Sequence, residues 1–130
     1  MAESPTLSRE GASLSGRRIL VVEDEYFLAD DIGRELRACG ADVAGPVADL
    51  DDALRILNDG SVVDGAVLDV NVGNAMVFPI ARELRTRHVP FVFATGYDQV
   101  TLGPEFQNVP LWEKPVDITA MVRGLAELIG

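Results

Sequence analysis

Apolar residues recur along the chain in two alternating patterns. Short, nearly continuous apolar runs predict five strands, at residues 17–23, 41–45, 64–70, 90–95 and 109–113. Between and after them, apolar residues at helical spacing predict helices at residues 25–40, 49–60, 76–87 and 117–129. The segment 97–108 has poor apolar spacing and contains Gly103-Pro104, so we expect a short or irregular helix there.

This alternation of strands and helices predicts a doubly wound α/β fold around a parallel sheet. The nearly continuous apolar strands support a parallel sheet, because helices cover both of its faces. Right-handed crossovers would bring the carboxyl ends of all strands to one edge. Ligands bind to such sheets at that edge, where the strand order reverses.

A chain of 130 residues fits one compact domain. Residues 1–16 are rich in Ser, Gly, Glu and Pro and are expected to form a disordered N-terminal extension, which leaves 17–130 as the folded domain. The sequence lacks the apolar core of a signal peptide and a run that could span a membrane, so we expect a cytoplasmic protein. The single cysteine, Cys39, cannot form an internal disulfide.

The net charge of −10 disfavours two classes of partner, nucleic acids and anionic membranes, because both would repel the chain. The same charge suits a protein that binds a cation or a basic protein surface. The Gly-rich patterns GxxxxGK[ST] and GxGxxG are both absent from the sequence, so nucleotide binding through a phosphate loop is not predicted.

Polar side chains stand at the ends of four predicted strands. They are Glu23, Asp24 and Glu25 after the first strand, Asp69 at the end of the third, Thr95 at the end of the fourth, and Lys114, followed by Pro115, after the fifth. Asp69 interrupts a run that is otherwise apolar, and burying an unpaired carboxylate is costly. If the fold is right, these polar groups converge although they lie far apart in the sequence.

The chemistry of this group favours a metal ion and phosphoryl transfer. Two carboxylates roughly 5 Å apart repel by about 3 kcal/mol at an effective dielectric constant of about 20. A cluster of Glu23, Asp24 and Asp69 would therefore destabilise the fold or raise carboxyl pKa values unless a cation lies among them. Carboxylates and a backbone carbonyl form an oxygen site that suits Mg²⁺. The Lys114 ammonium and the Thr95 hydroxyl would stabilise phosphoryl oxygens. Asp69 is then the natural nucleophile, because aspartate can form an acyl phosphate.

Each residue also has an ordinary structural alternative when it is taken alone. Acids after a first strand often only cap the next helix. Asp69 is also consistent with a loop or cap acid, Thr95 with a strand threonine and Lys114-Pro115 with a strand end before a helix. His88 is expected to be a surface residue. The functional interpretation is favoured because the four site positions fall at four strand ends in the right order.

Over residues 17–130 the sequence resembles a response-regulator receiver domain, the phosphorylatable half of two-component signalling. The motifs that carry the resemblance are ILVVEDE, VLDVN, FATG and the Lys-Pro pair of WEKP. The resemblance implies a flavodoxin-like, five-stranded parallel sheet with strand order 2-1-3-4-5 and about five helices, the fourth short or irregular. It also implies a single folded receiver domain over 17–130.

Carried over position by position, the resemblance makes Asp69 the phosphoacceptor. Thr95 and Lys114 would bind the phosphoryl group, and the Lys114–Pro115 peptide would be cis. The cofactor would be Mg²⁺, with Mn²⁺ as a possible substitute. The implied metal ligands are Glu23, directly or through water, Asp24, Asp69 and the backbone carbonyl of Asn71.

The stretch PFVFATGYD also resembles a narrower group, the FATGUY-type single-domain regulators of α-proteobacteria. These regulators are associated with HWE or related histidine kinases and with general stress signalling. The motif matches over residues 93–96 and departs from the pattern at Tyr97 and Asp98.

The switch position of the wider family, three residues before Lys114, is usually aromatic and here is Leu111. We therefore expect the segment 97–108 to move on phosphorylation instead. Tyr97 is expected to shield the phosphoryl group from the hydrolytic water and to slow self-dephosphorylation.

Our interpretation is a stand-alone receiver that takes a phosphoryl group from a histidine kinase on Asp69. Because the chain ends at Gly130, directly after the last predicted helix, no output domain is expected. Output would pass through phosphorylation-dependent contacts with a downstream protein or phosphotransfer protein, or the chain would act as a phosphate sink or relay. We expect the output surface at 97–108 with the fifth strand and last helix, and kinase docking at Phe27 and Leu28.

Two alternatives remain open at this point. A small phosphatase of the haloacid-dehalogenase kind is one, because Asp69 with Asn71 resembles the DxD of that group, although Asn71 replaces the general acid. A degenerate receiver that only binds a partner is the other. The receiver interpretation predicts no enzyme beyond the phosphorylation and dephosphorylation of its own aspartate.

Overall fold

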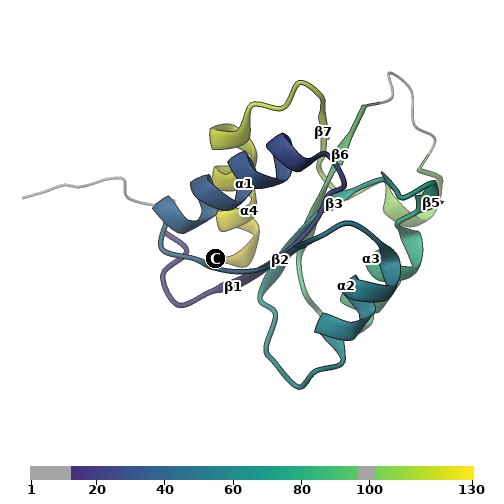
Figure 1. Ribbon diagram of the computed structural model, residues 1–130, viewed down its shortest axis with the longest axis horizontal. Coiled ribbons are helices and arrows are strands. Elements are labelled where there is room, and N and C mark those ends of the chain that lie inside the picture. Colours follow the sequence, from purple (N-terminus) through teal and green to yellow (C-terminus); the bar gives the residue numbers. More distant parts are fainter. Residues whose placement is uncertain (1–12, 97–101) are drawn as a thin grey trace, which may run out of the picture.

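The computed structural model describes residues 13–96 and 102–130. In this part the chain forms one central sheet between two layers of helices (Figure 1). Its strands are β1 (Arg18–Val22), β2 (Asp42–Val47), β3 (Gly65–Asp69), β6 (Phe91–Thr95) and β7 (Leu111–Glu113). They are parallel and follow the order β2-β1-β3-β6-β7. The five predicted strands and their flavodoxin-like order 2-1-3-4-5 are confirmed.

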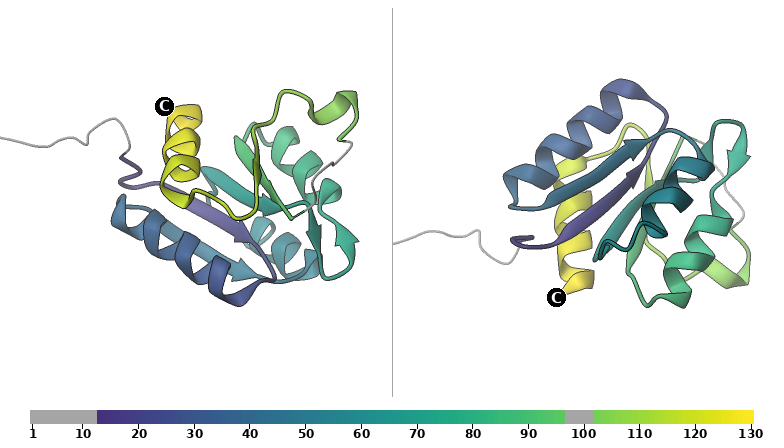
Figure 2. Two further views of the ribbon diagram at one scale, coloured as in Figure 1. Left: turned by 90° about the horizontal axis from the view of Figure 1, so that it is seen from above. Right: turned by 60° about the horizontal axis from the view of Figure 1, so that its bottom comes forward.

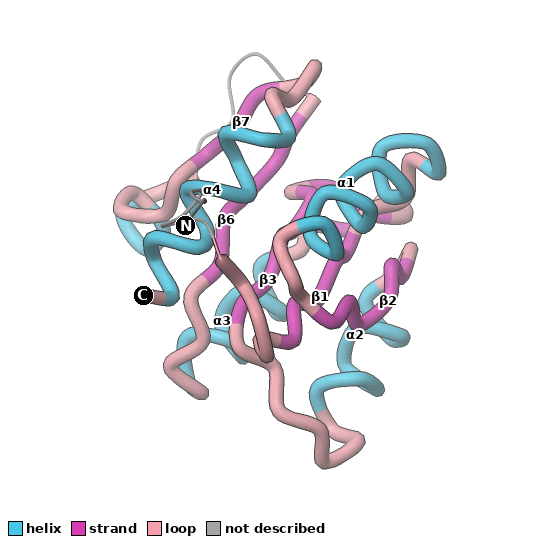
Figure 3. The backbone as a smooth tube through the Cα atoms, turned by 90° about the vertical axis from the view of Figure 1, so that its left-hand side faces the viewer, coloured by secondary structure: helices cyan, strands magenta, loops and turns pink. Residues whose placement is uncertain are grey.

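The helices are α1 (Tyr26–Ala38), α2 (Leu50–Leu57), α3 (Phe78–Thr86) and α4 (Ile118–Ile129). Helices α1 and α4 cover one face of the sheet, and α2 and α3 cover the other (Figures 2 and 3). The expected irregular fourth helix is a single 3-10 turn, η1 (Pro104–Phe106). None of the helices in 13–96 and 102–130 is long and apolar enough to cross a membrane.

The sheet divides the core into two apolar clusters. The cluster under α1 and α4 is aliphatic and includes Ile32, Leu36 and Leu125. The cluster under α2 and α3 contains four phenylalanines, Phe78, Phe91, Phe93 and Phe106. Because strands β1, β3 and β6 bury side chains on both faces, their sequences are apolar nearly throughout.

The packed part of the chain begins earlier than expected. Leu14 is buried in the cluster under α1 and α4, and its backbone N–H donates to the carbonyl of Cys39 at 2.8 Å. The sequence places Leu14 within the expected disordered extension 1–16, because one apolar residue among Ser and Gly gives no periodic signal. Residues 1–12 lie outside the described part, so the extension stays a prediction for them.

A short antiparallel hairpin after β3 was not predicted. It pairs β4 (Asn71–Val72) with β5 (Ala75–Met76). Gly73 and Asn74 at its turn both have positive φ, 57° and 66°, as a two-residue hairpin turn of the primed kind requires. The hairpin places the backbone that follows Asp69 beside the carboxyl edge of the sheet (Figure 1).

Candidate functional site

The ends of the central strands bring the predicted site residues together. Asp69 is the last residue of β3 and Thr95 is the last residue of β6. Glu23 follows β1, and its backbone N–H donates to the carbonyl of Val47 at 3.0 Å. The backbone N–H of Lys114 donates to the carbonyl of Thr95 at 2.8 Å, which fixes the end of β7 beside β6. Because the sheet is parallel, residues from four strand ends meet at one edge.

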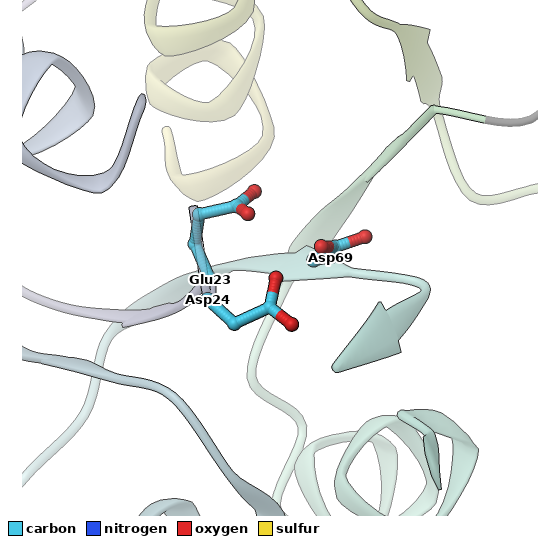
Figure 4. Close-up of side chains that lie close together, drawn as sticks. All are labelled: Glu23, Asp24 and Asp69. Atoms are coloured by element: carbon cyan, nitrogen blue, oxygen red, sulfur yellow. The ribbon is translucent and has the colours of Figure 1, made fainter. Parts of the chain in front are cut away.

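Three carboxylates face one another at this edge (Figure 4). Glu23, Asp24 and Asp69 each offer one oxygen, and these oxygens all lie within 4.8 Å of one another. Glu23 and Asp69 are only 3% and 5% exposed, whereas Asp24 is exposed. The oxygen Oε1 of Glu23 is buried and, in the described part of the chain, has no hydrogen-bond partner. An unpaired buried carboxylate oxygen in such a cluster fits a divalent cation with oxygen ligands.

Lys114 supplies the positive charge of the site. Its Nζ donates to Glu23 Oε2 at 3.2 Å and to Asp69 Oδ2 at 3.3 Å, and it also donates to Glu25 Oε1. The Lys114–Pro115 peptide is cis, as the resemblance implied. The ammonium therefore lies among three carboxylates from two different strand ends.

Backbone N–H groups orient the carboxylates. The N–H of Glu25 donates to Glu23 Oε2 at 3.0 Å, and the N–H of Asn71 donates to Asp69 Oδ1 at 3.3 Å. In the turn of the hairpin, the N–H of Gly73 donates to Asp24 Oδ2 at 3.1 Å. The hairpin thus links the residues after β3 to the acidic pair after β1.

The electrostatics of the site oppose full ionisation without a cation. Burial raises the pKa of the Glu23 carboxyl from 4.5 to about 7, and the charge of Asp69 adds to that rise. Burial also raises the pKa of Asp69, against the opposing effect of Lys114. Burial alone would lower the pKa of Lys114, but Glu25, Glu23 and Asp69 outweigh it and raise that pKa. A divalent cation would relieve the crowding of negative charge.

The carboxylates of Asp24, Glu25 and Asp69 line a cavity of about 310 Å³. Its lining comprises Asp24, Glu25, Asp69, Asn71, Asn74, Gly96 and Lys114. The Asp69 carboxylate forms part of this lining, so a group that enters the cavity can reach it. The arrangement joins a buried carboxylate, an acidic oxygen site and a fixed ammonium, which are groups that phosphoryl transfer to an aspartate uses.

No protein-family model matches the chain, and no curated protein matches it significantly. Among solved structures, SdrG from Sphingomonas melonis Fr1 is 33% identical, with a TM-score of 0.75, over 92% of this chain and 98% of that one. SdrG from Pseudomonas melonis Fr1, in a structure described as a BeF3-activated conformation, is 32% identical over 90% and 99%, with a TM-score of 0.70. A response regulator receiver protein from Sinorhizobium medicae WSM419 is 24% identical over 90% and 97%, with a TM-score of 0.75.

The chain belongs to the response-regulator receiver domains. It is similar to the single-domain receiver SdrG over nearly the whole length of both chains. Receiver domains are phosphoacceptors of signalling pathways rather than enzymes with a separate substrate, and their partners are histidine kinases. This family assignment decides against the haloacid-dehalogenase alternative.

Three further receiver features of the sequence analysis concern Tyr97, Leu111 and the start of α1. Tyr97 falls within 97–101, which the structure does not describe. Leu111 lies on β7 and is exposed. Leu28, expected in the kinase-docking face, is half-buried against the core, and the exposed aromatic residues at the start of α1 are Tyr26 and Phe27. The periodicity of α1 alone does not distinguish these neighbours, because all three are apolar or aromatic.

The sequence assigned no role to Glu25 and Asn74, which line the cavity, or to Gly73, whose backbone N–H donates to Asp24. The hairpin had a sequence signal, since Gly-Asn between Val72 and Ala75 favours a two-residue turn. Glu25 had no sequence signal of its own, because its contact with Lys114 joins residues that lie 89 positions apart in the chain.

Proposed function

We propose that this receiver accepts a phosphoryl group on Asp69 from a histidine kinase with Mg²⁺ and signals through phosphorylation-dependent contacts with other proteins. The observation that carries the proposal is the buried Asp69 carboxylate, which lines an open cavity and contacts Lys114 at 3.3 Å. The description of an SdrG structure as BeF3-activated supports it, because BeF3 takes the place of a phosphoryl group.

In the proposed reaction an oxygen of Asp69 bonds to phosphorus while the bond between phosphorus and the kinase histidine nitrogen breaks. The electron pair of that bond stays with the nitrogen, and the product is an acyl phosphate on Asp69. Lys114 and the Thr95 hydroxyl bind the phosphoryl oxygens. Hydrolysis restores the free Asp69 carboxylate, because water attacks phosphorus and the carboxylate leaves as an anion.

Glu23, Asp24, Asp69 and the backbone carbonyl of Asn71 are the proposed metal ligands. The cluster of three carboxylates and the unpaired Glu23 oxygen support this ligand set. When bound, Mg²⁺ would neutralise carboxylate charge and polarise the phosphoryl oxygens. Mn²⁺, with similar ligand preferences, would be able to replace it.

The finer assignment is a FATGUY-type regulator in the cytoplasm that receives its phosphoryl group from an HWE-type kinase. The FATG sequence before the undescribed residues 97–101 supports it. Tyr26 and Phe27, exposed at the start of α1, support kinase docking near the cavity. The segment 97–108 is proposed to move on phosphorylation, with Tyr97 as a shield against hydrolysis. A downstream protein or a phosphotransfer protein would bind that segment with β7 and α4.

The test is phosphotransfer from autophosphorylated candidate histidine kinases, with Mg²⁺ present, followed by intact-protein mass spectrometry. We expect a base-labile phosphoryl adduct on the wild-type chain and none on Asp69→Asn. Acetyl phosphate as donor separates the chemistry of the receiver from the choice of kinase. A wild-type chain that takes up no phosphoryl group from any donor would instead favour a degenerate receiver that only binds a partner.

A further inference from the structure

Glu25 occupies a helix-capping position but does not cap the helix. It is the N-cap residue of α1, with an extended backbone at φ −83° and ψ 109°, yet in the described chain its side chain makes no capping hydrogen bond. Short polar side chains are preferred at this position because they reach the free N–H groups of the first turn. The Glu25 carboxylate lies at the cavity instead, where Lys114 Nζ donates to Oε1. Its side chain therefore serves the site rather than the helix.

The contact with Glu25 uses a hydrogen-bond donor of Lys114 that phosphoryl binding needs. An ammonium has three donors, and those of Lys114 are directed to Glu25, Glu23 and Asp69. The Glu25 side chain is 59% exposed, whereas those of Glu23 and Asp69 are buried. The Glu25 contact is thus the one that Lys114 exchanges for a phosphoryl oxygen at the lowest desolvation cost.

The charge of Glu25 also acts on any group that enters the cavity. The site holds one ammonium and four carboxylates, and Glu25 is the carboxylate that no proposed role in metal binding or phosphoryl acceptance requires. Phosphoryl donors are anions, so a negative charge in the cavity lining opposes their approach to Asp69.

We propose that Glu25 is a positioning residue that holds Lys114 in a resting arrangement and slows phosphorylation of Asp69. The inference rests on the proposed phosphoacceptor function. With acetyl phosphate, an Asp69 oxygen bonds to phosphorus, the bond from phosphorus to the acetate oxygen breaks, and acetate leaves with the electron pair. Lys114 exchanges Glu25 for a phosphoryl oxygen during this step. Glu25 acts through Lys114 and does not contact the reacting atoms.

The experiment compares wild type, Glu25→Gln and Glu127→Gln in phosphorylation by acetyl phosphate with Mg²⁺. Glu127 is an exposed residue of α4, so its variant makes the same change in net charge outside the cavity. At low ionic strength we expect Glu25→Gln to react about three- to tenfold faster than wild type, as loss of one charge roughly 6 Å from the incoming anion implies at an effective dielectric constant of about 40 to 80. Glu127→Gln is expected to stay within about twofold.

Two further readouts distinguish this role from a merely structural one. The advantage of Glu25→Gln is expected to shrink as ionic strength rises, because salt screens an exposed charge. The BeF3 concentration for half-saturation, followed by NMR, is expected to fall in the same variant. Equal or slower phosphorylation of Glu25→Gln, or an equal gain in Glu127→Gln, would overturn the inference while leaving the proposed function intact. A wild-type chain that no donor phosphorylates defeats both.

Discussion

The cavity at the carboxyl edge and the phenylalanine cluster under α2 and α3 are built on opposite physical grounds. In the cavity, Glu23 and Asp69 are carboxyls buried beside like charge, and burial raises the pKa of both. In the cluster, the ring of Phe93 lies 5.5 Å from that of Phe91 and 5.6 Å from that of Phe106, with edge-to-face geometry. Apolar burial stabilises the fold in the cluster, whereas carboxylate burial costs stability in the cavity.

Strand β6 connects the two regions. Phe93 and Thr95 are two residues apart on this strand, so their side chains point to the same face. The cluster therefore supports the strand that ends at Thr95, and Phe106 joins η1 to the same rings. Mutations in the cluster should therefore lower stability, whereas mutations in the cavity should change phosphoryl chemistry and raise stability where they remove a crowded carboxylate.

The largest effect on stability is expected from Phe93→Ala. Phe93 is fully buried in the middle of the cluster, and truncation of a buried phenylalanine costs about 3–5 kcal/mol. We expect urea unfolding to show this loss, while the folded fraction still takes up phosphoryl groups. Phe27→Ala is the matched control, because Phe27 is 81% exposed, and it should change stability by less than about 0.5 kcal/mol. Equal losses in the two variants would contradict the assignment of the cluster.

In the metal-free protein, by contrast, the carboxyl group of Glu23 is expected to lower the free energy of unfolding when it ionises. Glu23 has a pKa of about 7 in the folded protein against an ordinary value of 4.5, so between these values the folded state binds more protons than the unfolded state. The contribution of Glu23 to the free energy of unfolding is therefore fully present below about pH 4.5. It is lost as the pH rises through about 7, and the loss is at most about 3 kcal/mol. The raised pKa of Asp69 acts in the same direction.

Chemical denaturation in EDTA between pH 5 and pH 8 measures this dependence. Glu23→Gln removes the titrating group and keeps the shape of the side chain, so it should flatten the profile and stabilise the protein at pH 8. The lowered pKa values of Asp59 and Glu105 do not interfere, because those groups titrate below this range. A wild-type stability that rises between pH 5 and pH 8 would show that the carboxyls are not crowded.

These two regions also show which features the sequence predicts. The apolar runs predict the five strands because parallel strands are buried on both faces, and the parallel arrangement then places Asp69, Thr95 and Lys114 at one edge. The phenylalanines were predictable as core residues but their grouping was not, since Phe78 and Phe106 reach Phe93 from different elements. Contacts set by tertiary geometry, such as that of Glu25 with Lys114, have no periodic signal.

Local features were missed for a different reason. Leu14 is a single apolar residue in a polar stretch, and its burial depends on the apolar cluster under α1 and α4 rather than on its sequence neighbours. The hairpin 71–76 has strands of two residues each, too short for alternation to be read. The cis Lys114–Pro115 peptide followed from family resemblance, because sequence patterns alone do not determine the isomer.

An intermediate effect on stability is expected from Mg²⁺, because a bound cation should offset the repulsion among the carboxylates of the cavity. A ligand that binds only the folded state stabilises it by about 1.4 kcal/mol at a free concentration about tenfold above Kd. At pH 8 we expect Mg²⁺ to raise the thermal unfolding midpoint of wild type. Asp24→Asn should reduce that response, because Asp24 is the exposed member of the carboxylate cluster. Asp31→Asn, which changes the same charge on the outer face of α1, should respond as wild type does.

The smallest effect is expected where an ion pair and the phenylalanine cluster meet. Arg82 on α3 donates to both carboxylate oxygens of Glu105, at 2.8 and 3.1 Å, while Phe106 stacks on Phe78 with ring centroids 5.2 Å apart. Because the ion pair is exposed, Glu105→Gln should leave the thermal midpoint unchanged and raise amide exchange in η1 by less than about fivefold. High salt should abolish the difference.

The matched control is Glu83→Gln, which removes an ion pair with Arg87 on the same α3 and should leave exchange in η1 unchanged. If Glu105→Gln raised the rate of amide exchange in η1 by a much larger factor, the ion pair rather than ring packing would hold η1 against α3. Charge would then contribute to stability within the phenylalanine cluster as well, next to the segment proposed to move on phosphorylation. A small effect means that any such movement must displace Phe106 from its rings, so the apolar cluster sets the free energy that phosphorylation has to overcome.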